Sequence, residues 1–292
     1  MPLLQVLRPA LPILIGASVM LTLSMGLRQS LGIFMQPLTH DIGISVSDFT
    51  LAVAVQNLAW GFLQPFAGAM TVRYGFRSIM VVGSLLYMAG LALMASAHGI
   101  VSIMIGGGVF IGASLACTAT AIGMSVAPRA VPETVRSTVL GIVSAAGSLG
   151  ALLSAPFGQM LSDGFGWRVG LSGFVVLALI MVPAAWFAGR VDKIPLPRSS
   201  TSEEIGDASA LTAAKTAFSN ASFVVMSCAF MVCGMQLVFL TTHLPSYLAI
   251  CGLDPFALDA LRGCADLALR LKPDALRLKA AMVDARVDVE FG

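Results

Sequence analysis

Long apolar runs, each close to the length of a membrane-spanning helix, recur along most of this chain. Seven runs qualify, at residues 11–37, 50–71, 79–97, 100–126, 137–161, 169–189 and 222–248. A helix needs about 20 apolar residues to cross the hydrocarbon core of a bilayer. Inside the seven runs there is no Asp or Glu, and the one Lys or Arg is Arg28. With 57% hydrophobic and 11% charged residues, the chain is predicted to be an all-α membrane protein.

The distribution of Lys and Arg between the connecting segments predicts the orientation of the helices. If the N-terminus is cytoplasmic, the inner segments hold nine basic residues and the outer loops hold only Arg168. The nine are Arg8, Arg73, Arg77, Arg129, Arg136, Arg190, Lys193, Arg198 and Lys215. Cytoplasmic loops carry the excess of Lys and Arg in membrane proteins. We therefore expect a multi-pass protein of the cell inner (plasma) membrane with a cytoplasmic N-terminus and the lipid bilayer as partner.

Changes in composition divide the chain into four parts. An N-terminal bundle of six transmembrane helices, 1–189, precedes a polar cytoplasmic linker, 190–219, with Pro, Ser and both signs of charge. A seventh transmembrane helix is expected in 220–252. The rest, 253–292, is a polar tail: 12 of the 37 residues from position 256 are charged, against 20 of the preceding 255. No run in this tail is long enough to span a bilayer.

The first and seventh apolar runs share a pattern. "MGLRQSLGIFMQPL" and "CGMQLVFLTTHLPSYL" each contain a glycine that is followed eleven residues later by a proline. This register aligns Arg28 with Gln236. Parallel repeats related by an axis along the membrane normal are one design of secondary transporters, and a chance match of two apolar segments is the alternative.

One short motif carries the resemblance to a known family. In "GAMTVRYGFR", residues 68–77, Gly68, Arg73, Gly75 and Arg77 match a glycine and basic-residue pattern in the loop after the second helix. With the plan of six helices, a charged central loop and further helices, the chain resembles the major facilitator superfamily of secondary transporters. In that family the loop acts as a cytoplasmic latch between two half-transporters. Val72 stands where the family has Asp, so an expected helix cap and ion-pair partner is missing.

A second match to the superfamily lies in the fifth run, "GIVSAAGSLGALLSAPFGQ". It resembles a degenerate form of a glycine and proline pattern of the family's antiporters, with Gly150 in place, Ser154 replacing a glycine and Pro156 one residue late. The resemblance covers residues 1–255. Because family members usually have twelve helices, we expect an apparently truncated chain, an N-terminal half plus a seventh helix, that is weakly active or inactive alone. Whether the tail from Phe256 arises from a frameshift, from a fusion or is natural stays open.

Arg28 is the residue that most directly suggests a function. A charged Arg at the centre of a membrane helix costs at least about 2.5–3.5 kcal/mol, and it normally faces a watery cavity or a partner. A structural partner, or a side chain that reaches the outer headgroups, is the alternative to a substrate contact. In the superfamily the first and seventh helices line the transport path. A guanidinium binds carboxylates in a planar, two-pronged way. The pattern predicts transport of a small organic anion, such as a monocarboxylate, by alternating access, with Arg28, Gln29, Asn57 and Gln236 as substrate-binding residues.

Other interpretations are a drug exporter of the same fold and a non-transporting membrane scaffold. The run "GGGVFIG" lacks the Lys and Ser/Thr of a phosphate loop, and its Gly108 and Gly112 have the spacing of a close helix contact, a packing role also expected for Gly150 and Pro156. His243 is read as an interfacial residue or a proton carrier. No Ser-His-Asp or metal-ligand spacing is present, and the five cysteines form no framework. We therefore expect no enzyme, cofactor, metal, nucleotide or nucleic acid.

Overall fold

The computed structural model describes residues 7–194 and 218–250, without the side chains of 241 and 244–250, and in these residues it contains helices and no strands. The α-helices are α2 (Leu11–Ser30), α3 (Met35–Ile42), α4 (Val46–Ala95), α5 (Ile100–Ile103), α6 (Ile111–Thr118), α7 (Thr120–Arg129), α8 (Arg136–Phe165), α9 (Trp167–Ala188) and α12 (Ala221–Ile250). Short 3-10 helices are η1 (Leu31–Phe34), η3 (Glu133–Val135) and η4 (Gly189–Lys193), and η2 (Met104–Phe110) is a π-helix. Six described helical segments are long and apolar enough to cross a membrane, which confirms the predicted all-α membrane fold.

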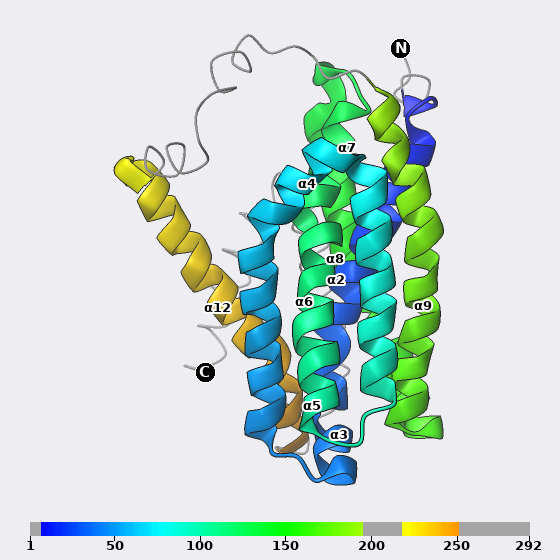
Figure 1. The fold of residues 1–292 in the computed structure, drawn as a ribbon, viewed down its shortest axis with the longest axis vertical. Coiled ribbons are helices and arrows are strands. Elements are labelled where there is room, and N and C mark those ends of the chain that lie inside the picture. Colours follow the sequence, from blue (N-terminus) through cyan, green and yellow to red (C-terminus); the bar gives the residue numbers. More distant parts are fainter. Residues whose placement is uncertain (1–6, 195–217, 251–292) are drawn as a thin grey trace, which may run out of the picture.

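The helix α4 consists of two arms that run in opposite directions. Gly75 interrupts its helical geometry with φ of 85° and ψ of 159°, a region of backbone space that is open almost only to glycine. Figure 1 shows the chain rising through the first arm and descending through the second. α4 therefore makes two crossings, and each of the seven apolar runs of the sequence lies in a crossing of the described bundle.

Local capping signals explain where the first crossing ends and the second begins. Gly43, with φ of 71°, ends α3 in the left-handed conformation that favours glycine. Ser45 and Asp48 then form a reciprocal cap of α4: the Asp48 N–H donates to the Ser45 hydroxyl over 3.1 Å, and the Ser45 N–H donates to the Asp48 carboxylate over 2.9 Å. This capping box satisfies two backbone donors that a helix start leaves open.

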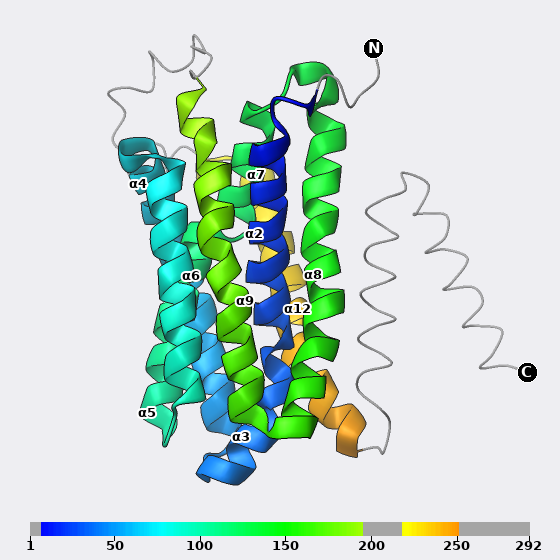
Figure 2. The same cartoon turned by 90° about the vertical axis from the view of Figure 1, so that its right-hand side faces the viewer.

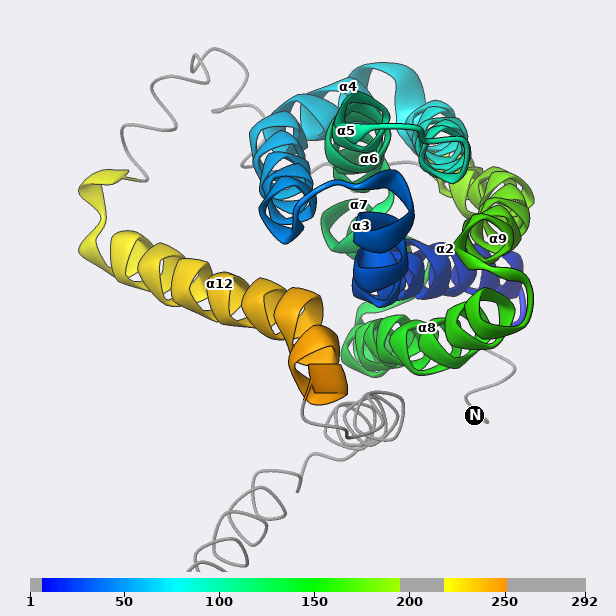
Figure 3. The same ribbon diagram turned by 90° about the horizontal axis from the view of Figure 1, so that it is seen from below.

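The helices form a bundle around α2, with α12 to one side. α2 packs against α8 and α9, and it lies between them in Figures 2 and 3. α4 packs against α6, η2 and α9. α12 contacts the bundle near η1 and α2, while its opposite end swings away from the other helices (Figure 1). Six crossings thus form one packed unit, and α12 touches that unit over a short stretch.

The surface of the bundle is suited to lipid. Large apolar side chains such as Val176, Leu179 and Ile180 of α9 are about half exposed or more, at 64%, 55% and 47%. Exposed apolar side chains of this kind extend over most of the described crossings. Because hydrocarbon is the solvent around a membrane helix, apolar residues outside and backbone groups satisfied within the helices are the expected arrangement.

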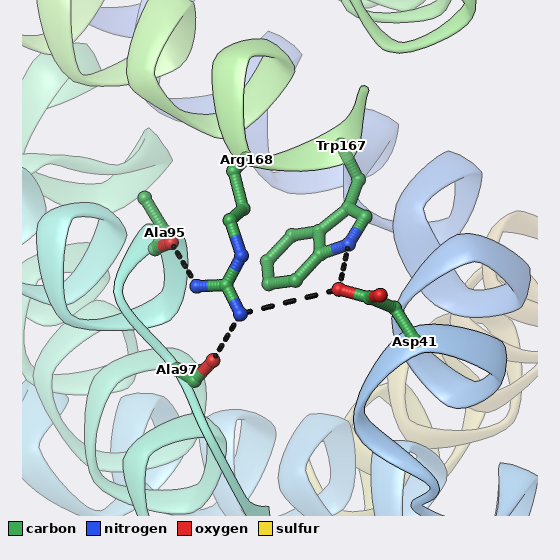
Figure 4. Close-up of polar contacts among 5 residues, drawn as sticks. All are labelled: Asp41, Ala95, Ala97, Trp167 and Arg168. Carbon is green, nitrogen blue, oxygen red and sulfur yellow. Dashed lines mark hydrogen bonds and ion pairs between the residues drawn. The ribbon is translucent and has the colours of Figure 1, made fainter.

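A polar cluster ties three crossings together at the end of the bundle opposite the N-terminus (Figure 4). Arg168, at the start of α9, donates to the carbonyl oxygens of Ala95 over 3.2 Å and Ala97 over 3.0 Å, which lie where α4 ends. The Trp167 indole donates to the carboxylate of Asp41 over 3.0 Å, and an Arg168 Nη2 lies 3.9 Å from the same carboxylate. Arg168 therefore donates hydrogen bonds to carbonyl groups that the end of a helix leaves unpaired. Asp41 links α3 to α9 through its bond with Trp167.

Two glycines allow the backbones of α2 and α8 to touch. A Cβ placed on Gly26 would lie 2.5 Å from the carbonyl oxygen of Gly150, and one on Gly150 would overlap the carbonyl of Thr22. The Thr22 hydroxyl also donates to the carbonyl oxygen of Ala146 over 2.8 Å. Ser154, where the antiporter pattern has a glycine, places its hydroxyl against Gly26. In lipid the hydrophobic effect does not drive helices together, and small residues at such a contact stabilise the association by letting the backbones pack closely.

We predict that Gly150→Val lowers the thermal stability of the protein. The added side chain would overlap the Thr22 backbone of α2, and overpacking of this kind costs about 1–3 kcal/mol. The measurement is the apparent melting temperature in detergent, followed by size-exclusion chromatography. Gly141→Val on the same helix is the matched control, because a Cβ there meets nothing within 4 Å. Equal losses of stability in the two variants would contradict the assignment of Gly150 to the α2–α8 contact.

Candidate functional site

A cavity of about 1110 Å³ lies between α2, the first arm of α4, α7, α8 and α12. Its walls are mainly apolar, with Met25, Leu58 and Phe239 among the lining residues. None of the described lining residues is Asp or Glu, and the charged one among them is Arg28. The cavity therefore combines apolar walls with a positively charged group.

Arg28 lies near the middle of the 32-residue span Leu11–Ile42 and is 8% exposed. Its Nη2 donates to the Oδ1 of Asn57 over 2.6 Å, and its guanidinium carbon lies 5.0 Å from the centre of the Trp60 ring. These contacts hold the guanidinium inside the bundle, so the side chain does not reach the headgroups. Asn57 is a neutral partner, and within residues 7–194 and 218–250 no carboxylate forms an ion pair with Arg28, so these residues leave its positive charge uncompensated.

The position of Asn57 is fixed from both sides. Its Nδ2 donates to the carbonyl oxygen of Val53 over 2.7 Å, one turn earlier in α4. The preceding residue, Gln56, is 2% exposed, and its Nε2 donates to the carbonyl oxygen of Gly107 over 2.8 Å. Gly107 belongs to the π-helix η2. This bond fixes α4 against η2 at the level of the Arg28 contact.

Glycines of the "GGGVFIG" run lie at the same contact. A Cβ on Gly108 would lie 3.1 Å from the Val55 side chain, and one on Gly112 would lie 2.6 Å from the carbonyl oxygen of Gln56. Both positions thus permit a close approach of η2 and α6 to α4. Pro156, the other residue expected to shape packing, lies inside α8.

The structure brings together three of the four predicted substrate-binding residues. Arg28, Gln29 and Asn57 line the cavity. Gln236 is exposed on α12 and does not line it, although its neighbours Met235 and Leu237 do. A contact between Gln236 and a substrate therefore stays a prediction.

Most of the other lining residues were not predicted to bind a substrate, and Trp60, Thr242 and His243 are among them. Trp60 follows Asn57 by three residues, which places both on one face of α4, so this spacing was a usable signal. Thr242 and His243 line the cavity from α12. Their positions depend on the rotation of α12, and the sequence of that helix has no polar stripe that would indicate it.

The loop motif of the sequence lies at the end of the bundle near the N-terminus. Gly75 makes the turn of α4 described above, and the guanidinium carbon of Arg77 lies 4.4 Å from the centre of the Trp186 ring. Arg73 lies over the ring of its neighbour Tyr74 at 5.4 Å. Gly68 lies inside the first arm, where a Cβ would meet nothing within 4 Å. The latch role of this loop stays a prediction.

Asp192 supplies the cap that Val72 cannot provide. Its carboxylate accepts the backbone N–H groups of Phe76 over 2.8 Å and Arg77 over 2.9 Å, at the start of the second arm of α4. A Cβ on Gly75 would lie 2.8 Å from the same carboxylate. Val72 is 84% exposed and faces away. An acid in η4, after α9, thus caps this helix, whereas the family pattern places the capping Asp within the loop itself, at position 72.

The chain matches the model of the Major Facilitator Superfamily over residues 16–265. The match begins within α2, includes the later described crossings and ends within the segment expected as a non-family polar tail, 253–292. The chain belongs to the Major Facilitator Superfamily, a class of membrane transporters. The fold and the family thus identify a multi-pass membrane protein of a transporter family.

Two curated proteins of the mouse, Mus musculus, are similar to this chain over part of its length. Monocarboxylate transporter 3 is 26% identical over 173 residues, which is 57% of this chain and 34% of the mouse protein. Monocarboxylate transporter 11 is 31% identical over 165 residues, or 55% of this chain and 36% of the relative. The matched part of the chain therefore spans about a third of the length of these relatives.

We predict that Asp192→Ala lowers the thermal stability by removing the cap of the second arm of α4. Loss of an N-terminal cap costs about 1 kcal/mol, within a range of about 0.5–2 kcal/mol. The matched control is Asp163→Ala, since Asp163 is exposed and bonds the side chain of Gln159 within α8. The apparent melting temperature in detergent should fall for Asp192→Ala and stay near the wild-type value for the control. An unchanged value for Asp192→Ala would contradict the capping role.

Proposed function

We propose that this protein binds a small organic anion, a monocarboxylate, in the cavity beside Arg28, as the substrate of transport by alternating access. The observation that carries the proposal is a guanidinium in the wall of a mainly apolar cavity, with no carboxylate partner among the described residues. Arg28, Gln29 and Asn57 are the proposed binding residues. The carboxylate would bind the guanidinium, and the apolar part of the substrate would lie along the methionine and leucine side chains of the walls.

Electrostatics favour an anion over other substrates. The attraction between unit charges about 4 Å apart is about 4 kcal/mol at an effective dielectric constant of 20. The Asn57 amide offers a dipole but no negative charge, so a bound carboxylate would relieve more of the burial cost of Arg28 than a neutral molecule. A cationic drug would be repelled by the same charge. This argument favours the anion carrier over the drug exporter.

The relatives support the same substrate class. Two proteins that are similar to this chain over 57% and 55% of its length are named as monocarboxylate transporters. The cavity lies in the matched family region, between the first crossing and α12. Alternating access requires a central site between two units that move against each other. A cavity lined by the bundle on one side and by α12 on the other has the position that this mechanism needs.

We also propose that the protein lies in the plasma membrane with a cytoplasmic N-terminus. Basic residues of three connecting segments meet at one end of the bundle: Arg77 and Arg129 lie close to Phe76, and Arg190 follows α9. The opposite end holds Arg168, whose guanidinium is engaged by the ends of α3 and α4. The end with the excess of basic residues is the cytoplasmic one by the positive-inside rule.

We predict that Arg28→Gln strongly weakens anion binding while the protein stays folded. The measurement is the binding of butyrate to the purified chain in lipid nanodiscs by isothermal titration calorimetry. Loss of the charged partner should weaken binding by at least about thirtyfold, or about 2 kcal/mol. Arg28→Lys keeps the charge but lacks the planar fork, so its affinity should lie between the two.

The matched control is Arg73→Gln, because Arg73 is exposed and lies outside the cavity. Butylammonium, which has a similar alkyl chain and the opposite charge, tests whether the site prefers a negatively or a positively charged ligand. Unchanged butyrate affinity in Arg28→Gln, or binding of butylammonium as tight as that of butyrate, would overturn the anion proposal. The second result would favour the drug exporter.

A further inference from the structure

Two buried donors in the cavity wall have no hydrogen-bond partner among the described residues. They are the Nε of Arg28 and the indole Nε1 of Trp60. Both side chains line the same cavity, and the guanidinium carbon lies 5.0 Å from the centre of the indole ring. Buried donors in folded proteins are nearly always paired with protein groups or ordered water. Two neighbouring unpaired donors therefore indicate a place for a bound acceptor.

Asn57, the nearest polar side chain, does not serve these donors. Its Oδ1 accepts the Nη2 of Arg28, and its Nδ2 donates to the carbonyl oxygen of Val53. Both ends of the amide are thus engaged, and the amide holds the guanidinium by one nitrogen while the Nε stays unpaired. Indole and guanidinium groups are donors without acceptor atoms. Trp60 and Arg28 line the cavity, and their unpaired nitrogens are buried behind its surface, so a rotation of these side chains would bring the donors to an acceptor in the cavity.

We propose that Trp60 is a second substrate-binding residue, whose indole N–H and the guanidinium of Arg28 bind the two oxygens of one substrate carboxylate. The proposal rests on the proposed function and adds a residue that decides specificity. A carboxylate supplies two acceptor oxygens and a negative charge, and hydrogen bonds to it are the strong, charge-assisted kind. The corresponding amide supplies one acceptor and an NH₂ group, which would face a donor. Trp60 therefore selects carboxylates against neutral isosteres.

The substitution Trp60→Phe separates the indole N–H from the aromatic ring. The ring lies close to Arg28 and attracts the cation through its π-electrons, and phenylalanine keeps an aromatic face while it lacks the donor. Trp186→Phe is the matched control. Its ring lies 4.4 Å from the guanidinium carbon of Arg77, and it does not line the cavity. Each substitution thus removes one indole N–H beside an arginine, in the cavity or outside it.

The experiment compares butyrate and butyramide binding to the purified 292-residue chain in lipid nanodiscs. We expect Trp60→Phe to weaken butyrate binding about tenfold, equivalent to about 1.4 kcal/mol, and to change butyramide binding much less. The preference for the carboxylate over the amide should therefore fall. Trp60→His, which restores a ring N–H, should recover part of that preference, and Trp186→Phe should retain all of it.

A fluorescence measurement keeps the test independent of the stability of the Trp60 variants. The chain has three tryptophans, so in a Trp167→Phe/Trp186→Phe chain the emission comes from Trp60 alone. Saturating butyrate should shift this emission because the indole N–H gains an acceptor. The absence of a shift would overturn the role of Trp60.

The outcomes separate this inference from the proposed function. If Trp60→Phe binds butyrate as tightly as the wild type while Arg28→Gln does not, the role of Trp60 is wrong and the anion site remains. If Arg28→Gln also binds as tightly as the wild type, the anion site itself is wrong.

Discussion

The structure depends on one constraint, which is that lipid offers no hydrogen bonds to an exposed backbone. Each crossing must pair its own N–H and C=O groups, so the described spans are helical along their length. The departures from regular helix lie where protein groups surround them: η2 packs against α4, and the turn at Gly75 is covered by the carboxylate of Asp192. Because lipid provides no hydrophobic drive between helices, close contact between backbones holds the crossings together. Gly26 and Gly150 show this most directly.

The same constraint makes a buried charge conspicuous. Arg28 sits two residues after Gly26, so the tightest helix contact in its neighbourhood fixes the start of its side chain. Asn57 holds the other end by one hydrogen bond. Burial of an arginine is costly in hydrocarbon, and the structure offsets that cost with a neutral amide and an aromatic face in place of a carboxylate. An acid at this point would neutralise the guanidinium permanently, whereas a neutral partner leaves the charge available to an anion from the cavity.

The length of the apolar runs and their lack of charged residues were sufficient to predict the helices. A helix must cross the thickness of the bilayer, and a charged side chain inside it is costly. The cavity position of Arg28, Gln29 and Asn57 also followed from polar residues placed deep in apolar runs. The side of α12 on which Gln236 lies could not be predicted, because no row of polar residues along this apolar helix indicates its rotation. Asp192 was missed for another reason: it caps a helix that begins 116 residues earlier, and a contact between such distant segments leaves no local pattern. Trp60 could have been predicted, because it follows Asn57 by three residues and so lies on the same face of the helix.

The proposed binding residues of the cavity wall lie on two helices. Arg28 belongs to α2, which is fastened to α8 through Gly26 and Gly150. Asn57 and Trp60 belong to α4, which is fastened to η2 through the bond from Gln56 to Gly107. The bond between Arg28 and Asn57 therefore joins α2 to the first arm of α4, in addition to the contacts that both helices make with α9 and the bond from the Tyr87 hydroxyl to the carbonyl oxygen of Ser24. A carboxylate bound by Arg28 and Trp60 would bridge the same two helices within the bundle.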